Sequence, residues 1–213
     1  MRIHFLTGDD SWIVPFVDRM VKQAKVAGHE TQRIAHHDDL VPGDLLFILG
    51  YLRVLPDECL DLHDHNLVVH ESDLPKGRGF SPMSWQIAED RREIPFCLFE
   101  AVPEVDAGPV YSRRTLHLDG TELHHEWREL QGLLTERMVL DFIEQYPDVE
   151  ATPQKGESTF YERRTHEHDE IDIDQPFRSA FHDIRVCNPK EYPAWFEYEG
   201  RKFKVSVEPW EEE

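Results

Sequence analysis

The first half of the chain alternates short apolar runs with stretches in which apolar residues recur every three or four positions. The apolar runs at 3–6, 44–50 and 66–69 predict buried strands, and residues 30–34 predict a shorter strand. Residues 11–27 have a helical period, with Ser11 as a candidate cap and Gly28 as the stop. This order of elements predicts an α/β fold with an open Rossmann-like sheet and flanking helices.

The same alternation continues as far as Tyr146. We expect a helix at 84–90, strands at 96–99 and 110–116, and a long helix at 122–146. The long helix has one apolar stripe, formed by Leu123, Trp127, Leu130, Leu134, Met138, Phe142 and Ile143. No Gly-x-Gly-x-x-Gly follows the first strand, so the dinucleotide-binding fingerprint is absent.

The character of the chain changes after Pro147. Residues 148–175 are polar and lack periodicity, and 176–186 predict a short helix. Residues 195–198 and 203–207 alternate around Glu199-Gly200-Arg201, which is typical of a β-hairpin. We therefore expect a main domain at 1–147 and a C-terminal extension with a β-hairpin at 148–213.

Charge and cysteine usage restrict the partners. The net charge of -20, from 43 acidic and 23 basic residues, repels phosphate backbones, so we expect no nucleic-acid partner.

The widely spaced Cys59, Cys97 and Cys187 indicate reduced, buried thiols. The N-terminal apolar run is too short for a signal peptide, and no run approaches the ~20 residues of a membrane span. We therefore expect a cytoplasmic protein with no membrane partner.

The candidate chemistry lies where the strand at 66–69 ends. His70 follows this strand, and a loop with Pro75, Gly77 and Gly79 comes next. A carboxylate follows 36 positions after His70, in the predicted turn Asp106-Ala107-Gly108. An imidazole paired with a buried carboxylate can move one proton during acyl transfer. The alternatives are a hydrogen-bonded loop histidine and an ordinary turn-forming aspartate.

These residues resemble the folate-dependent formyltransferase superfamily, which includes methionyl-tRNA formyltransferase, glycinamide ribonucleotide formyltransferase and the sugar N-formyltransferases. Its pattern is Asn-x-His-x-Ser-x-Leu-Pro, a Gly-containing loop and a later Asp-x-Gly. The likeness covers about residues 45–146, and resembles the N-terminal domain of methionyl-tRNA formyltransferase. The matching residues are His70, Ser72, Leu74, Pro75, Gly79, Asp106 and Gly108.

The resemblance implies an N-formyltransferase that uses N10-formyltetrahydrofolate. In that role His70 is the catalytic base, and Asp106 orients it and favours its protonated form. The backbone on either side of the site would line the folate slot, and other polar or aromatic side chains are candidates for the acceptor site. The slot residues are Gly50, Tyr51, Leu52, Val102, Pro103, Glu104, Val105 and Asp106; the acceptor candidates are Asp10, Trp12, Lys76, Arg78, Arg163 and Arg164.

One residue departs from the family pattern. The Asn that normally supports the developing oxyanion falls on Val68. Asn66 shares a strand face with Val68 and His70. It lies four residues, or about 13 Å of strand, from His70, so it cannot simply replace the missing amide. Gln86 and Ser81 are the other candidate donors.

The acceptor is inferred from the C-terminal part. Residues 192–203 resemble the C-terminal hairpin of sugar N-formyltransferases, which favours a nucleotide-linked amino sugar as a small-molecule substrate. Three alternatives stay open: a non-catalytic folate- or nucleotide-sugar-binding protein, a glycinamide ribonucleotide-type relative and a deformylase-type relative. A homodimer is also left open.

Thirteen histidines make a metal site conceivable. They include pairs at 36–37, 63–65, 124–125 and 166–168. Because these pairs fall on different predicted elements and no cysteine joins them, we expect no metal.

Overall fold

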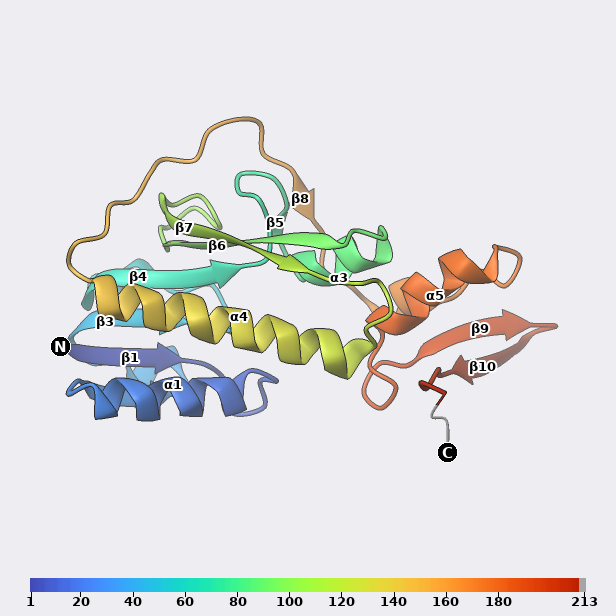
Figure 1. Ribbon diagram of the computed structural model, residues 1–213, viewed down its shortest axis with the longest axis horizontal. Helices are drawn as coiled ribbons and strands as arrows, with labels where there is room; N and C mark the ends of the chain where they lie inside the picture. Colours follow the sequence, from blue (N-terminus) through green and yellow to red (C-terminus); the bar gives the residue numbers. More distant parts are fainter. Residues whose placement is uncertain (211–213) are drawn as a thin grey trace.

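A six-stranded sheet is the centre of the computed structural model, which describes residues 1–210 (Figure 1). The first four strands in spatial order are parallel, and the last two are antiparallel to their neighbours. The sheet is therefore mixed, which agrees with the predicted open Rossmann-like α/β fold. Its order is β2 (Glu30–Ile34), β1 (Arg2–Leu6), β3 (Gly43–Ile48), β4 (His63–His70), β6 (Glu93–Glu100) and β7 (Val110–His117).

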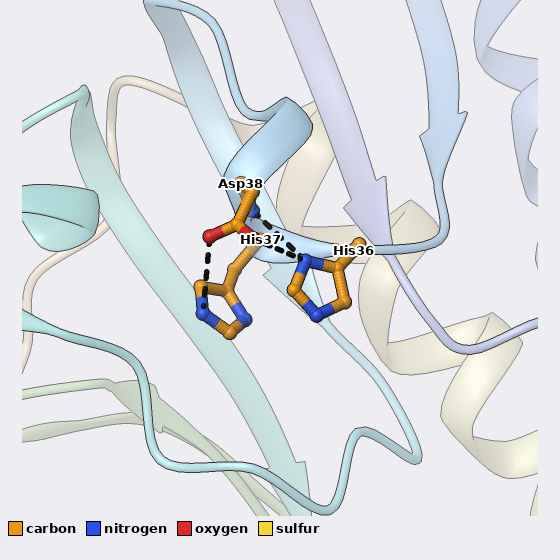
Figure 2. A group of neighbouring side chains, drawn as sticks. All are labelled: His36, His37 and Asp38. Carbon is orange, nitrogen blue, oxygen red and sulfur yellow. Dashed lines mark hydrogen bonds and ion pairs between the residues drawn. The ribbon is translucent and has the colours of Figure 1, made fainter.

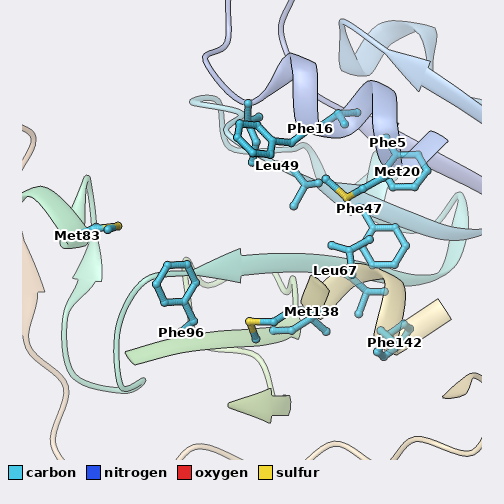
Figure 3. Close-up of a cluster of buried hydrophobic side chains, with 14 of the residues drawn as sticks. Phe5, Phe16, Met20, Phe47, Leu49, Leu67, Met83, Phe96, Met138 and Phe142 are labelled. Atoms are coloured by element: carbon cyan, nitrogen blue, oxygen red, sulfur yellow. The ribbon is translucent and has the colours of Figure 1, made fainter. Parts of the chain in front are cut away.

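Two long helices, α1 (Val14–Val26) and α4 (His124–Gln145), pack together on one face of the sheet (Figure 1). Alternate residues of the parallel strands, such as Phe5, Phe47 and Leu67, point into the core beneath them (Figure 3). A Cβ at Gly132 of α4 would collide with the ring of Phe16, so a glycine is needed where the two helices approach.

The start of α1 differs from the prediction. The cap position is Ile13, and no side chain caps the helix. Ser11 instead donates its hydroxyl hydrogen to the Gly50 carbonyl at 3.2 Å. The two loops after β1 and β3 are therefore tied together at the carboxyl edge of the sheet.

The other face of the sheet carries a smaller apolar cluster, covered by the short elements η1 (His37–Asp39) and α2 (Asp57–Leu60). Neither element has enough residues to show a period, so neither could be predicted from the hydrophobic pattern. Tyr51, Val68 and Ala101 pack at the margin of this cluster. Its buried members are Leu6, Ile34, Leu40, Leu46, Ile48, Leu55 and Cys59.

The segment after α4 crosses over the sheet and returns beside β5 (Arg78–Gly79), with which β8 (Phe160–Tyr161) forms a short parallel pair (Figure 1). The chain continues through η2 (His166–Asp169) to α5 (Phe177–Val186), which packs on α3 (Pro82–Ala88). The boundary at Pro147 stays a prediction.

The predicted C-terminal hairpin is present as β9 (Ala194–Tyr198) and β10 (Arg201–Val205). Phe196 and Phe203 are directly opposed, with their rings stacked 5.3 Å apart. These aromatic side chains therefore pack within the hairpin.

The three cysteines are unpaired and buried, in agreement with the sequence-based expectation. Among residues 1–210, no helix is both long enough and apolar enough to cross a membrane. The cytoplasmic location stays a prediction.

Candidate active site

His70 is the last residue of β4, and only 6% of its surface is exposed. Its Nε2 lies 2.8 Å from the carbonyl oxygen of Gly77. Because a carbonyl can only accept, the hydrogen of this bond belongs to Nε2. In the neutral ring the lone pair is then on Nδ1, which is the atom available to take a proton.

Asp106 lies beside this ring although 36 sequence positions separate the two residues. Its Oδ2 is 3.8 Å from His70 Nε2 and accepts a hydrogen bond from the Gly79 backbone at 2.9 Å. The structure thus brings the predicted pair together. It assigns the direct hydrogen bond to Gly77, and leaves Asp106 as a neighbouring negative charge.

The loop between them is shaped by its glycines. Gly77 and Gly79 both have positive φ angles, of 70° and 101°. A Cβ at Gly79 would collide with the carbonyl oxygen of Tyr161, because β5 and β8 approach closely there. Glycine is therefore required where the loop meets the strand from the C-terminal segment.

Val68, at the family's Asn position, packs against apolar clusters on its face of the sheet. The candidate substitutes are directed elsewhere: Asn66 Nδ2 donates to the Leu60 carbonyl at 2.8 Å. Gln86 Nε2 contacts the carbonyls of Glu71 and Pro82. Ser81 has the left-handed φ of 48° just before α3. None of these contacts places a replacement donor beside His70.

The predicted folate slot has two exposed walls. Gly50 has a φ of 57°, and Tyr51 places its hydroxyl 2.7 Å from His37 Nδ1. Among the described residues, the backbone groups of 52–54 make no hydrogen bond within the protein. Apolar side chains flank them: Leu52 and Val54 are 69% and 70% exposed.

The second wall follows β6. Ala101 packs against the same cluster as Tyr51, and Val105 is 48% exposed. Val102 is partly buried, whereas Pro103 and Glu104 are exposed. Unpaired backbone groups between apolar side chains suit a flat heterocycle with donors and acceptors on its edge.

The acceptor candidates fall in different places. Asp10 is exposed, and Trp12 is partly buried with the Arg128 guanidinium 4.7 Å above its ring. Lys76 lines a cleft of about 490 Å³ between the His70 loop and residues 152–157. Arg163 is exposed and lies 5.8 Å from the ring of Phe80.

Two of the arginine candidates are already engaged. Arg78 is buried and bonds to Glu104 and Gln154. Arg164 donates to the His168 carbonyl and lies 4.9 Å above the ring of Trp85. Both therefore hold protein segments together in this structure. Sequence reasoning missed Gln154, because a single Gln in a polar stretch carries no pattern.

His36, His37 and Asp38 form a group with the residue types of a metal site (Figure 2). The Asp38 carboxylate lies 3.1 Å from His36 Nδ1 and 3.5 Å from His37 Nε2. The Arg53 guanidinium is 2.6 Å from His36 Nε2, and Tyr51 is bonded to His37. The positive charge beside these side chains already comes from Arg53. His36 is also the N-cap of η1, so the group has a structural role without a metal ion.

A second histidine pair is buried at the other end of the sheet. His4 Nδ1 and His63 Nε2 share one hydrogen bond of 2.7 Å. Burial lowers the pKa of His63 to about 4 and also lowers the pKa of His4. Both rings are therefore neutral at physiological pH, and the His63 ring fills the space beside Gly43.

A family model described as "Formyl transferase" matches residues 13–129, which is more than half of the chain and includes the site. The chain belongs to the formyl transferase family. Among curated proteins, methionyl-tRNA formyltransferase from Sulfurihydrogenibium is 29% identical over 157 residues. That alignment covers 70% of this chain and 50% of the relative, so the chain spans about half of that protein's length.

Solved structures have the same fold along nearly the whole chain. Methionyl-tRNA formyltransferase from Clostridium thermocellum matches with a TM-score of 0.83 and 20% identity, over 99% of this chain and 94% of that one. A sugar N-formyltransferase from Shewanella matches with a TM-score of 0.74 and 11% identity, over 100% of this chain and 99% of that one.

HypX from Aquifex aeolicus, solved in complex with tetrahydrofolic acid, matches with a TM-score of 0.75 and 20% identity. The match covers 97% of this chain and 37% of HypX. The family predicted from the His70–Gly79 pattern and the predicted fold are therefore both confirmed.

Proposed function

We propose that this protein transfers the formyl group of N10-formyltetrahydrofolate to the amine of a nucleotide-linked amino sugar. The observation that carries the proposal is His70 at the end of β4, with the Asp106 carboxylate 3.8 Å from its Nε2. In a formyl transferase this pair supplies both elements of proton transfer, a base and a charge that stabilises the protonated base.

The roles of the residues follow from their contacts. The Gly77 carbonyl holds the Nε2 proton, so Nδ1 of His70 accepts the proton that the acceptor amine releases. As the ring becomes positive, the Asp106 carboxylate stabilises it. Bound N10-formyltetrahydrofolate would supply the activated formyl group. The unpaired backbone groups of 52–54 and the exposed Leu52 and Val105 suit its pterin ring.

Two observations favour an amino-sugar nucleotide over a tRNA acceptor. The net charge of -20 opposes binding of a phosphate backbone. Residues 192–203 resemble the C-terminal hairpin of sugar N-formyltransferases, and this segment forms β9 and most of β10. A small-molecule acceptor needs only a local cationic group, such as the exposed Lys76 or Arg163.

Val68 motivates a second candidate, a folate-binding protein of the same fold without catalysis. A missing oxyanion donor typically costs about 3–4 kcal/mol in transition-state stabilisation. The side-chain amides of Asn66 and Gln86 donate to the Leu60 and Glu71 carbonyls instead. This candidate predicts folate binding without transfer.

The test is a transfer assay with N10-formyltetrahydrofolate and a panel of nucleotide-linked amino sugars, with His70→Asn as the control. We expect release of tetrahydrofolate with at least one amino sugar, and its loss in the variant. Transfer only to methionyl-tRNA would show that the acceptor is this tRNA and not an amino sugar. Release of formate without an amine would identify a deformylase. Binding of a stable folate analogue with no transfer would support the second candidate.

A further inference from the structure

Gln154 lies in the segment between α4 and β8, outside every helix and strand, yet its side-chain amide is fully used. Its Nε2 donates to the backbone carbonyls of Asp106 and Gly108, both at 2.8 Å. Its Oε1 accepts a hydrogen bond from Arg78 Nη2 at 2.9 Å. A primary amide has two hydrogens, and here both are spent on the turn that carries Asp106.

Arg78 extends this contact to the first residues of the same turn. Its Nη1 donates to Glu104 Oε1 at 2.9 Å, and the residue is only 9% exposed. The guanidinium therefore bridges Glu104 and Gln154, with one terminal nitrogen bonded to each. Together the two side chains connect the loop after His70, the Asp106 turn and the crossing segment.

The crossing segment is itself anchored on both sides of Gln154. Thr152 exchanges two backbone hydrogen bonds of 2.8 Å with Val110 at the start of β7. Six residues after Gln154, Phe160 begins β8 and pairs with Arg78 of β5. The amide is therefore presented from a fixed backbone, not from a free loop.

The Asp106 turn needs such support because its backbone is unfavourable. Asp106 has a φ of 53°, in the left-handed region that non-glycine residues rarely adopt. Gly108 is buried, and a Cβ there would collide with the Glu100 carbonyl. Two carbonyls pulled toward one amide fix the turn in the conformation that directs the carboxylate to His70 and Gly79.

We infer that Gln154 is a positioning residue for the formyl transfer proposed above, acting through the Asp106 turn with Arg78 as its support. Its effect on turnover rests on the proposed function. Its effect on the turn does not, because the Gly79 N–H reports directly on the position of the Asp106 carboxylate. The two statements can therefore fail separately.

The experiment compares Gln154→Met, which removes the amide at similar length, with Gln145→Met on the exposed end of α4. Amide hydrogen exchange of Gly79, measured by NMR, should become about tenfold faster in Gln154→Met and stay unchanged in the control. Turnover should fall about tenfold in Gln154→Met and stay unchanged in the control. The melting temperatures of both variants show whether each is folded. Unchanged Gly79 exchange in folded Gln154→Met would overturn the inference.

A second variant separates positioning from packing and covers the case in which Gln154→Met does not fold. Gln154→Glu keeps the bond to Arg78 but turns a carboxylate oxygen toward the two carbonyls. Protonation of the introduced Glu at low pH restores one donor, so turnover relative to wild type should rise as pH falls from 7.5 toward the ordinary Glu pKa of about 4.3. Gln145→Glu should give a flat ratio. A flat ratio in Gln154→Glu, with Gly79 exchange as in wild type, refutes the positioning role.

If wild type transfers no formyl group to any acceptor, the proposed function fails. Faster Gly79 exchange in Gln154→Met would then still show that Gln154 holds the turn, and unchanged exchange would show that it does not.

Discussion

Val68 and His70 lie two residues apart on one face of β4, and their side chains have opposite surroundings. Val68 packs against the apolar clusters near Ile48 and Leu74. His70 is bonded through Nε2 to Gly77 and faces the Asp106 carboxylate. The base is therefore complete, whereas the position that supplies an amide in the family pattern is apolar. This pair separates the proton-transfer part of the site from the part that stabilises the oxyanion.

We expect Val68→Asn to raise turnover, by at most the ~100–1000-fold that an oxyanion donor provides. The same change buries a polar group among apolar neighbours, so it should lower the free energy of unfolding by about 1–3 kcal/mol. Steady-state kinetics and urea unfolding measure the two effects.

Val69→Asn is the matched control, because Val69 points to the opposite face and packs beneath the helices. It should be destabilising without any gain in rate. If Val68→Asn is destabilised and no faster, another group already stabilises the oxyanion. Unchanged stability and rate would mean that Val68 does not face the site.

His70→Asn should lower formyl transfer by at least ~100-fold, because the amide cannot accept the proton at neutral pH. The asparagine side chain is shorter than the imidazole and does not reach the position of Nε2, so the hydrogen bond to the Gly77 carbonyl is lost as well. His117→Asn at the exposed end of β7 is the control and should be as active as wild type. Near-normal turnover in His70→Asn would remove this residue from the mechanism.

Asp106→Asn should reduce turnover while the affinity for a folate analogue, measured by calorimetry, stays nearly unchanged. The amide oxygen can still accept from Gly79, but the negative charge beside His70 is lost. Asp64→Asn, on the exposed side of β4, is the control for removing one charge. Loss of folate affinity with a normal chemical step would instead make Asp106 a ligand contact.

The His4–His63 pair should make the protein less stable in acid. The pKa of His63 is depressed to about 4, so the unfolded chain takes up protons below about pH 6.5 while the folded chain does not. The stability from this pair is complete above pH 6.5 and is lost as pH falls toward 4. The shift of His63 alone corresponds to a loss of about 3 kcal/mol, and the lowered pKa of His4 acts in the same direction. Urea unfolding at several pH values measures the slope.

The double variant His4→Phe/His63→Phe should have a weaker dependence of unfolding free energy on pH between 6.5 and 4. His125→Phe, which changes an exposed histidine on α4, should keep the wild-type slope. An unchanged slope in the double variant would show that other groups cause the acid sensitivity.

The hydrophobic periodicity of the sequence was sufficient to predict most strands of the sheet and the two long helices. Runs such as 45–49 have no polar interruption, and that pattern is typical of strands covered on both faces. The direction of β6 and β7 could not be predicted, because a strand pattern is the same in both orientations. The strands β5 and β8 have two residues each, which is too short to produce a period.

The site was predictable to the extent that its residues are adjacent in sequence or belong to a family pattern. His70 and Asp106 came from such a pattern, and the structure places them 3.8 Å apart. The hydrogen bond from His70 to Gly77 and the clamp by Gln154 depend on how the loops fold back, which no local spacing encodes. Arg78 looked like a free cation for the same reason, since Glu104 and Gln154 lie 26 and 76 positions away.

The strand pair β5–β8 has a consequence for the order in which the protein is made. Gly77 donates its backbone hydrogen to Thr159, which is 82 positions later in the chain. On the ribosome, the loop that shapes His70 therefore emerges well before the residues that pair with it. The nascent chain can form the strands up to β4 early, but its reactive centre is assembled only after the crossing segment has been synthesised.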